Sequence, residues 1–178
     1  MELPKRKSVK LKNYDYSSNG SYFVTICVRD RMRILSSLCM DNTEVDGSIL
    51  EFIEIPQNHK PGKITVKLTD CGKIAERELL GLGQRYDGVS VEKYIIMPDH
   101  IHAIIRIRDY DAINDRVSLH DIVGGFKSLV SRACSSECGV VKIFQRSYSE
   151  HIIRSKEEYD DIKEYISKNP IRWYYSKQ

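Results

Sequence analysis

The sequence predicts an α+β fold in which helices cover one face of an antiparallel sheet and a further helix follows at the C-terminus. Three observations support this fold class. Short runs of β-branched and aromatic residues alternate along the chain with longer runs whose apolar residues recur at helical spacing. Two strand-like runs are separated only by a short proline-containing bend, which suits antiparallel neighbours. The chain of 178 residues is long enough for one domain with a substantial core.

The first half of the chain contains strand signals followed by a helix. Runs rich in β-branched or alternating apolar residues predict strands at residues 21–29, 49–53 and 63–68. Asp46-Gly47 precedes the second run and is a turn signal for a short hairpin. Thr69 or Asp70 can then cap a helix that ends near the glycines at 81–83.

The second half of the chain predicts two strands, a helix, a strand and a helix. The strand-like runs cover residues 90–97, 101–108 and 143–153. Ser118 is expected to begin the first helix. Within it, Gly124-Gly125 costs about 1 kcal/mol per glycine, which indicates the close approach of another segment. A capping-box pattern at residues 155–158 begins the last helix, which we expect to end at Asn169-Pro170.

This order of elements is that of a ferredoxin-like sheet with one helix added at the end. We expect residues 14–178 to form this single domain, with a β-hairpin insertion at about 36–68. We expect residues 1–13 to form a basic arm. Its first twelve residues hold five Lys or Arg and one acid, which gives +4, whereas the whole chain sums to +3. Such an arm suits phosphate binding, although a solvated tail explains it equally well.

The composition excludes several classes of protein. A hydrophobic content of 41% and a charged content of 30% are ordinary for a globular protein. No apolar run is long enough to cross a membrane, and the N-terminus lacks an apolar signal core, so we expect a soluble, cytoplasmic protein without a membrane partner. The five cysteines form no CxxC pair, which argues against a disulfide framework or a structural zinc site.

A pair of histidines is the most informative feature. His100 and His102 are two residues apart in a predicted strand, so their side chains point to the same face and can share a divalent cation. The alternate positions form an apolar stripe: Ile101, Ala103, Ile105 and Ile107. The strand is therefore expected to be half buried, with the two histidines on its outer, functional face. Exposed or structurally hydrogen-bonded histidines would also explain the pair.

The predicted last helix carries a second candidate. Tyr165 and Asn169 are four residues apart and therefore share one face of this helix, beside an apolar stripe that contains Ile162 and Ile166. A tyrosine in that position could be a nucleophile. It could equally be a core or interface aromatic residue whose hydroxyl has a local partner.

Four sequence blocks together resemble the REP-associated tyrosine transposases, which are single-tyrosine members of the HUH nucleases. The blocks are YIIMPDHIH at residues 94–102, GFKS at 125–128, QRSYSEHIIR at 145–154 and EYISKNP at 164–170. They follow the order of the family over roughly residues 14–175, which is nearly the whole chain.

The resemblance implies a ferredoxin-like fold and a metal-dependent enzyme that cuts single-stranded or hairpin DNA and transfers the strand. His100 and His102 match the metal-binding pair of the family. Tyr165 matches the nucleophile, which becomes linked to a 5′ phosphate and frees a 3′ hydroxyl. Asn169 matches a third metal ligand, but a residue before proline avoids helical backbone, so Glu150 or Asp99 could take that place. Mg²⁺ or Mn²⁺ is the expected metal.

Candidate DNA contacts are spread along the chain. The cations that could follow a DNA backbone are Lys5, Arg6, Lys7, Arg106, Lys127, Arg132, Arg146, Arg154 and Arg172, and the aromatic residues available for base stacking are Tyr14, Tyr16, Tyr22 and Trp173. Each cation alone could be a solvated surface charge. The single-tyrosine transposases include dimers that exchange active-site helices and members that act as monomers, so a homodimer is one of two open states.

Three other functions remain alternatives. A catalytically silent nucleic-acid-binding module could use the same sheet without cutting DNA. A rolling-circle or relaxase-type HUH nuclease shares the chemistry but has a different tyrosine arrangement and accessory domains. A metal-dependent hydrolase of small phosphates would need neither a tyrosine nor a basic arm. The presence of His100, His102 and Tyr165 together favours the transposase.

Overall fold

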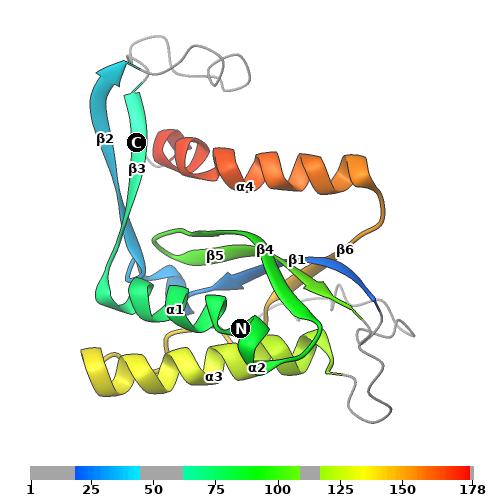
Figure 1. Ribbon diagram of the computed structural model, residues 1–178. Helices are drawn as coiled ribbons and strands as arrows, with labels where there is room; N and C mark the ends of the chain where they lie inside the picture. Colours follow the sequence, from blue (N-terminus) through cyan, green and yellow to red (C-terminus); the bar gives the residue numbers. More distant parts are fainter. Residues whose placement is uncertain (1–18, 45–61, 109–116, 177–178) are drawn as a thin grey trace, which may run out of the picture.

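A four-stranded antiparallel sheet lies at the centre of the fold. The computed structural model describes residues 19–44, 62–108 and 117–176. The strand order is β4-β5-β1-β6, with β1 (Gly20–Cys27), β4 (Val89–Ile96), β5 (His100–Ile107) and β6 (Ser149–Ile153). Two helices, α1 (Asp70–Leu80) and α3 (Leu119–Cys138), cover one face, and α4 (Lys156–Ser176) crosses the other (Figure 1). The predicted α+β, ferredoxin-like fold is confirmed.

The pairing of β1 with β5 defines the two faces of the sheet. Val24 lies opposite Ala103, and Thr25 lies opposite His102. Directly opposed residues point to the same face, and neighbours along a strand alternate. Val24 and Ala103 are fully buried in the core under α1 and α3. The histidine face is buried as well, since α4 covers it and Ile104 is 0% exposed. The expectation of a half-buried strand was therefore wrong.

A separate two-stranded sheet extends from this domain. It consists of β2 (Ser36–Glu44) and β3 (Gly62–Leu68), which pair antiparallel and lie beside the C-terminal part of α4 (Figure 1). The strand predicted at 63–68 is confirmed. The turn expected at Asp46-Gly47 and the strand expected at 49–53 lie outside the described residues.

Local signals at the starts of α1 and α3 were correct. The Thr69 hydroxyl accepts a hydrogen bond from Gly72 N, and Ser118 forms a capping box with Asp121. After Gly81 a short helix, α2 (Leu82–Arg85), follows, which the sequence pattern did not predict. A Cβ at Gly125 would lie 2.5 Å from the Tyr86 hydroxyl, whereas Gly124 has open space around it. The inferred close approach therefore holds at one glycine of the pair.

The last strand and helix differ from expectation at their ends. Only Ser149–Ile153 of the extended stretch predicted at 143–153 forms a strand, with an isolated bridge between Val28 and Phe144. The Ser155 hydroxyl caps α4 by accepting from Glu158 N at 3.1 Å. The helix then continues through Pro170 to Ser176. Proline removes one helical hydrogen bond, but Pro170 and Ile166 are both buried on α4, and this burial offsets that cost.

No helix in the described parts of the chain combines the length and apolar character that membrane crossing requires.

Candidate active site

The two histidines lie at the centre of the sheet with their Nδ1 atoms already engaged. Asp99 Oδ1 accepts a hydrogen bond from His100 Nδ1 at 2.6 Å. His102 Nδ1 is hydrogen-bonded to Thr25 Oγ1 at 2.9 Å. The two rings are 4.5 Å apart between centroids, at an interplanar angle of 72°. Because the Nδ1 atom of each ring is already hydrogen-bonded, the Nε2 atom is the one available to a cation, as in many metal-binding histidines.

Burial sets the charge of the second histidine. It lowers the pKa of His102 from 6.5 to about 3, and the neighbouring His100 and Arg31 act in the same direction. His102 is therefore neutral at physiological pH, and neutral imidazole is the form that binds metal ions.

Tyr165 and Asn169 extend from α4 toward this pair. The Tyr165 ring is 5.4 Å from the His102 ring and 6.0 Å from the Phe23 ring, measured between centroids, and its side chain is 37% exposed. Asn169 is one helical turn further and is 7% exposed. Its Oδ1 atom has no hydrogen-bond partner among the described residues. An unpartnered buried amide oxygen is costly and requires an explanation.

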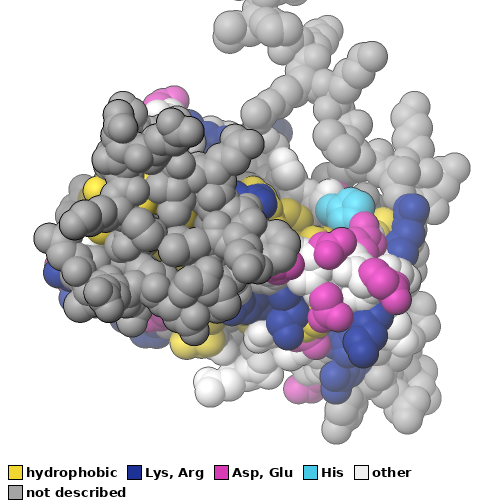
Figure 2. All heavy atoms as spheres, turned by 90° about the horizontal axis from the view of Figure 1, so that it is seen from above, with side chains coloured by type: hydrophobic (Ala, Val, Ile, Leu, Met, Phe, Trp, Pro, Cys, Tyr) yellow, Lys and Arg dark blue, Asp and Glu magenta, His cyan; other side chains and the backbone are white. Residues whose placement is uncertain are grey.

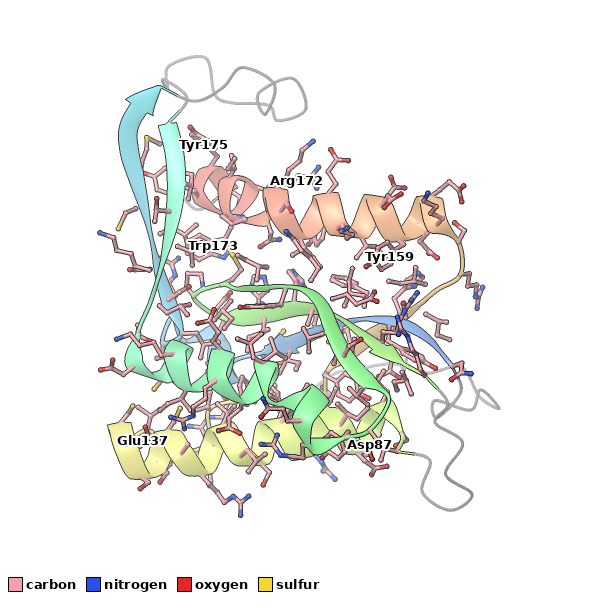
Figure 3. All side chains as sticks on the ribbon, in the orientation of Figure 1. Asp87, Glu137, Tyr159, Arg172, Trp173 and Tyr175 are labelled. Carbon is pink, nitrogen blue, oxygen red and sulfur yellow. The ribbon has the colours of Figure 1, made fainter. Side chains whose placement is uncertain are left out.

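These side chains line one pocket of about 360 Å³, whose walls are formed by Thr25, Arg31, His100, His102, Tyr165, Asn169, Arg172, Trp173 and Ser176. None of these lining residues is acidic. The Arg172 guanidinium carbon lies 5.7 Å from the centroid of the Tyr165 ring. Figure 3 shows Arg172 and Trp173 on the C-terminal half of α4. A cationic pocket that contains two imidazoles, an amide oxygen and a phenol suits a phosphate diester.

The two other residues considered as a third metal donor lie differently. Asp99 is engaged with His100 and also lies 3.6 Å from Arg31, measured from Oδ2 to Nη1. Glu150 lies opposite Val24 in the pairing of β1 with β6, so its side chain points to the other face of the sheet. The described residues contain no cluster of three His, Cys, Asp or Glu side chains that could hold a metal ion. Asn169, by contrast, lines the same pocket as the two histidines.

Those expected cations that lie in the described residues do not form one continuous track. Lys127 and Arg132 lie on α3, across the sheet from the histidines. Lys127 Nζ donates to the carbonyl oxygens of Gln145 and Arg146 at 2.7 and 2.8 Å, so it ties a loop in place. Arg146 itself is exposed in that loop. Lys5, Arg6, Lys7, Tyr14 and Tyr16 lie outside the described residues.

Two more of these cations lie at the opposite end of α4. Arg106 and Arg154 line a second cavity of about 520 Å³, together with Tyr159. Arg106 Nε also pairs with Glu92 Oε1 at 3.1 Å. Figure 2 shows basic and acidic side chains interspersed on the face of the molecule where α4 lies. Tyr22 is fully buried in the core and cannot stack on a base, which corrects the expectation for that residue.

Sequence reasoning missed three residues of the site. Thr25 and Phe23 reach the histidines only through the pairing of β1 with β5, and long-range register leaves no local signal. Arg31 lies in the short turn η1 (Arg29–Arg31), where Asp30 and Arg31 have left-handed φ angles of 54° and 53°. Such a backbone conformation costs about 1–2 kcal/mol per non-glycine residue. No sequence pattern marks this turn.

Comparisons with known proteins identify the family of this chain. The sequence profile of a family described as "Transposase IS200 like" matches residues 74–169. An uncharacterised protein of Haemophilus influenzae is 28% identical over 184 residues, which cover 94% of this chain and 89% of that protein.

Solved structures provide a fold comparison. The structure of a REP-associated tyrosine transposase bound to a REP hairpin superposes with a TM-score of 0.62 at 17% identity, over 96% of this chain and 78% of that chain. This likeness shows a shared fold. A Deinococcus radiodurans protein provisionally described as a transposase gives a TM-score of 0.45 at 15% identity, over 90% of this chain and 96% of that chain.

Proposed function

Because this chain belongs to the family of IS200-like transposases, we propose that it cuts and rejoins single-stranded DNA at hairpin-associated sites, with a divalent metal ion and a covalent bond to Tyr165. One observation carries this proposal: His100, His102, Asn169 and Tyr165 line one cationic pocket. The hairpin DNA in the solved relative supports the choice of substrate.

The residues of the pocket fit a metal ion. His100 and His102 would contribute Nε2 atoms, and Asn169 would contribute its buried Oδ1 atom, which otherwise lacks a partner among the described residues. Three neutral donors suit Mn²⁺ and leave room for the phosphate and water oxygens that Mg²⁺ prefers. The bound cation would neutralise charge on the attacked phosphate. The pairing of Asp99 with His100 and of Thr25 with His102 fixes both rings beforehand.

The proposed reaction exchanges one phosphate ester for another. The Tyr165 hydroxyl oxygen forms a bond to phosphorus, and the bond from phosphorus to the 3′ oxygen breaks. The phenol loses one proton, and the departing 3′ oxygen gains one. The number of phosphoester bonds is unchanged, so a 3′ hydroxyl can reverse the reaction and rejoin the strand.

The chain also has groups that suit single-stranded DNA. Arg172 lies beside Tyr165 and would contact phosphates near the cut, and Trp173 would stack on a base. Arg106 and Arg154, near the N-terminal end of α4, would contact the DNA strand farther from the cut. A stiff duplex resists the bending needed to bring a phosphate under this helix.

A denaturing gel tests this function against its alternatives. The probe is a single-stranded oligonucleotide from the flanks of the protein's own gene, labelled at its 3′ end so that the label stays with the protein-linked fragment. We expect a covalent adduct with Mg²⁺ or Mn²⁺, no adduct in EDTA and none with the fully paired duplex. Binding without an adduct would instead indicate a silent binding module, and cutting without an adduct would indicate a hydrolase.

A further inference from the structure

Arg31 has a backbone conformation that its residue type disfavours. Asp30 and Arg31 are consecutive residues with φ angles of 54° and 53°. Aspartate tolerates this left-handed region, but arginine gains nothing from it, and glycine would adopt it without strain. Strained residues persist where the surrounding structure holds them, and they gather at functional sites. The presence of arginine rather than glycine at this strained position therefore indicates a role for its side chain.

The turn that carries Arg31 is held from two sides. Val28 N donates to the carbonyl of Asp99 at 2.9 Å, and Arg29 N donates to the carbonyl of Ile143 at 2.7 Å. Arg31 N donates back to the Val28 carbonyl at 3.2 Å. The first bond attaches the turn to Asp99, which directly precedes His100, and the second attaches it to Ile143, so the backbone of the turn is anchored beside the histidines.

The Arg31 side chain lines the same pocket as His100, His102 and Tyr165. Its Nη1 atom lies 3.6 Å from Asp99 Oδ2, and the side chain is 54% exposed. A guanidinium has five N–H donors, so one loose ion pair leaves donors for a ligand. The lining of this pocket has cations from two elements, η1 and α4, and no carboxylate, which suits an anionic group such as a phosphate.

We propose that Arg31 donates hydrogen bonds to a non-bridging oxygen of the phosphate that Tyr165 attacks. This inference rests on the proposed function and adds a catalytic residue to it. Negative charge on the non-bridging oxygens must be stabilised while the phosphorus is transferred from the 3′ oxygen to the tyrosine oxygen. Preorganised hydrogen-bond donors are usually the largest contribution to such stabilisation. The anchored turn η1 provides that preorganisation.

Single-turnover cleavage of a single-stranded oligonucleotide at saturating protein tests this role. Arg31→Gly removes the guanidinium and relieves the backbone strain. We expect its cleavage rate to fall about 100-fold, while its thermal midpoint equals or exceeds that of the wild type. Arg31→Lys keeps the charge and should lose less. Arg29→Gln removes a charge from the same turn outside the pocket and should cut at the wild-type rate.

A second substrate separates phosphate contact from a structural effect. In a methylphosphonate at the cut position, one non-bridging oxygen is replaced by a methyl group. For one of the two diastereomers, the difference between wild type and Arg31→Gly should largely vanish, because the contacted oxygen is gone. The inference is overturned if Arg31→Gly cuts within threefold of the wild type, or if its defect persists on both diastereomers. A wild-type protein that forms no adduct would overturn the proposed function itself.

Discussion

Tyr165 and Asn169 line the same pocket because α4 continues without interruption through Pro170. The two residues are one helical turn apart, so both face the histidines of β5. A helix that ended at Asn169 would leave its amide free to turn away. The buried proline therefore helps to position the proposed metal donor, Asn169, next to the proposed nucleophile, Tyr165.

Loss of the Asn169 amide should weaken metal binding. Asn169→Ala removes the buried oxygen that we assign to the metal, so we expect the affinity for Mn²⁺ to fall at least tenfold in a titration of the purified protein. Asn169→Asp keeps an oxygen and should retain binding. Ser167→Ala, two residues earlier on the exposed side of α4, is the control. An unchanged Mn²⁺ affinity in Asn169→Ala would show that the third donor lies elsewhere.

The hydroxyl of Thr25 should matter through its hydrogen bond to His102. Thr25→Val preserves the shape of the side chain and removes the partner of His102 Nδ1. Loss of such a supporting bond costs about 10- to 100-fold in metal affinity or activity. Mn²⁺ titration and adduct formation measure the effect. Ser135→Ala, on the exposed side of α3, should leave both unchanged, and an equal loss in that control would argue against a specific role for Thr25.

Acid should destabilise the metal-free protein through His102. Its pKa is about 3 in the folded chain and near 6.5 in the unfolded chain, so the unfolded chain binds the proton more strongly. The contribution of the neutral imidazole to stability is complete above pH 6.5 and is lost as the pH falls toward 3. Imidazole nitrogen shifts in NMR spectra should show a neutral His102 at pH 5. Titration of this ring near pH 6.5 would contradict the assignment.

Removal of residues 1–12 tests the basic arm that we propose for DNA binding. The deletion removes five positive charges and one negative charge. We expect lower affinity for single-stranded DNA and a flatter dependence of affinity on salt. The logarithmic slope should fall by about 0.7 for each DNA phosphate that the arm neutralises in the full-length protein. The cut position should not change. An identical salt slope would identify the arm as a solvated tail.

Local sequence signals were sufficient to predict individual helices and strands. Thr69, Ser118 and Ser155 cap helices as expected, because a cap depends only on residues three positions away. The alternation through His100 and His102 likewise placed both on one face. The order of these elements was sufficient to predict the ferredoxin-like arrangement, which the strand order confirms.

The features that the sequence did not predict depend on contacts between segments far apart in the chain. The preference of the residue before proline favoured an end of the helix at Asn169, but burial of Pro170 and Ile166 outweighed it. Strand register placed Glu150 on the wrong face for a metal ligand and brought Thr25 to His102. Surface cations have no periodic signal, so nothing in the sequence separated Lys127, which ties a loop, from Arg172 in the pocket.

Identification of the DNA-linked residue tests the central claim most directly. The wild-type adduct should be digested with protease and nuclease, and the peptide that carries the residual nucleotide should be sequenced by mass spectrometry. We predict that the nucleotide is attached to Tyr165. Tyr165→Phe should bind the same oligonucleotide and form no adduct, whereas Tyr159→Phe, six residues earlier on α4, should form it normally. Attachment to any other residue, or an adduct in Tyr165→Phe, would contradict this account.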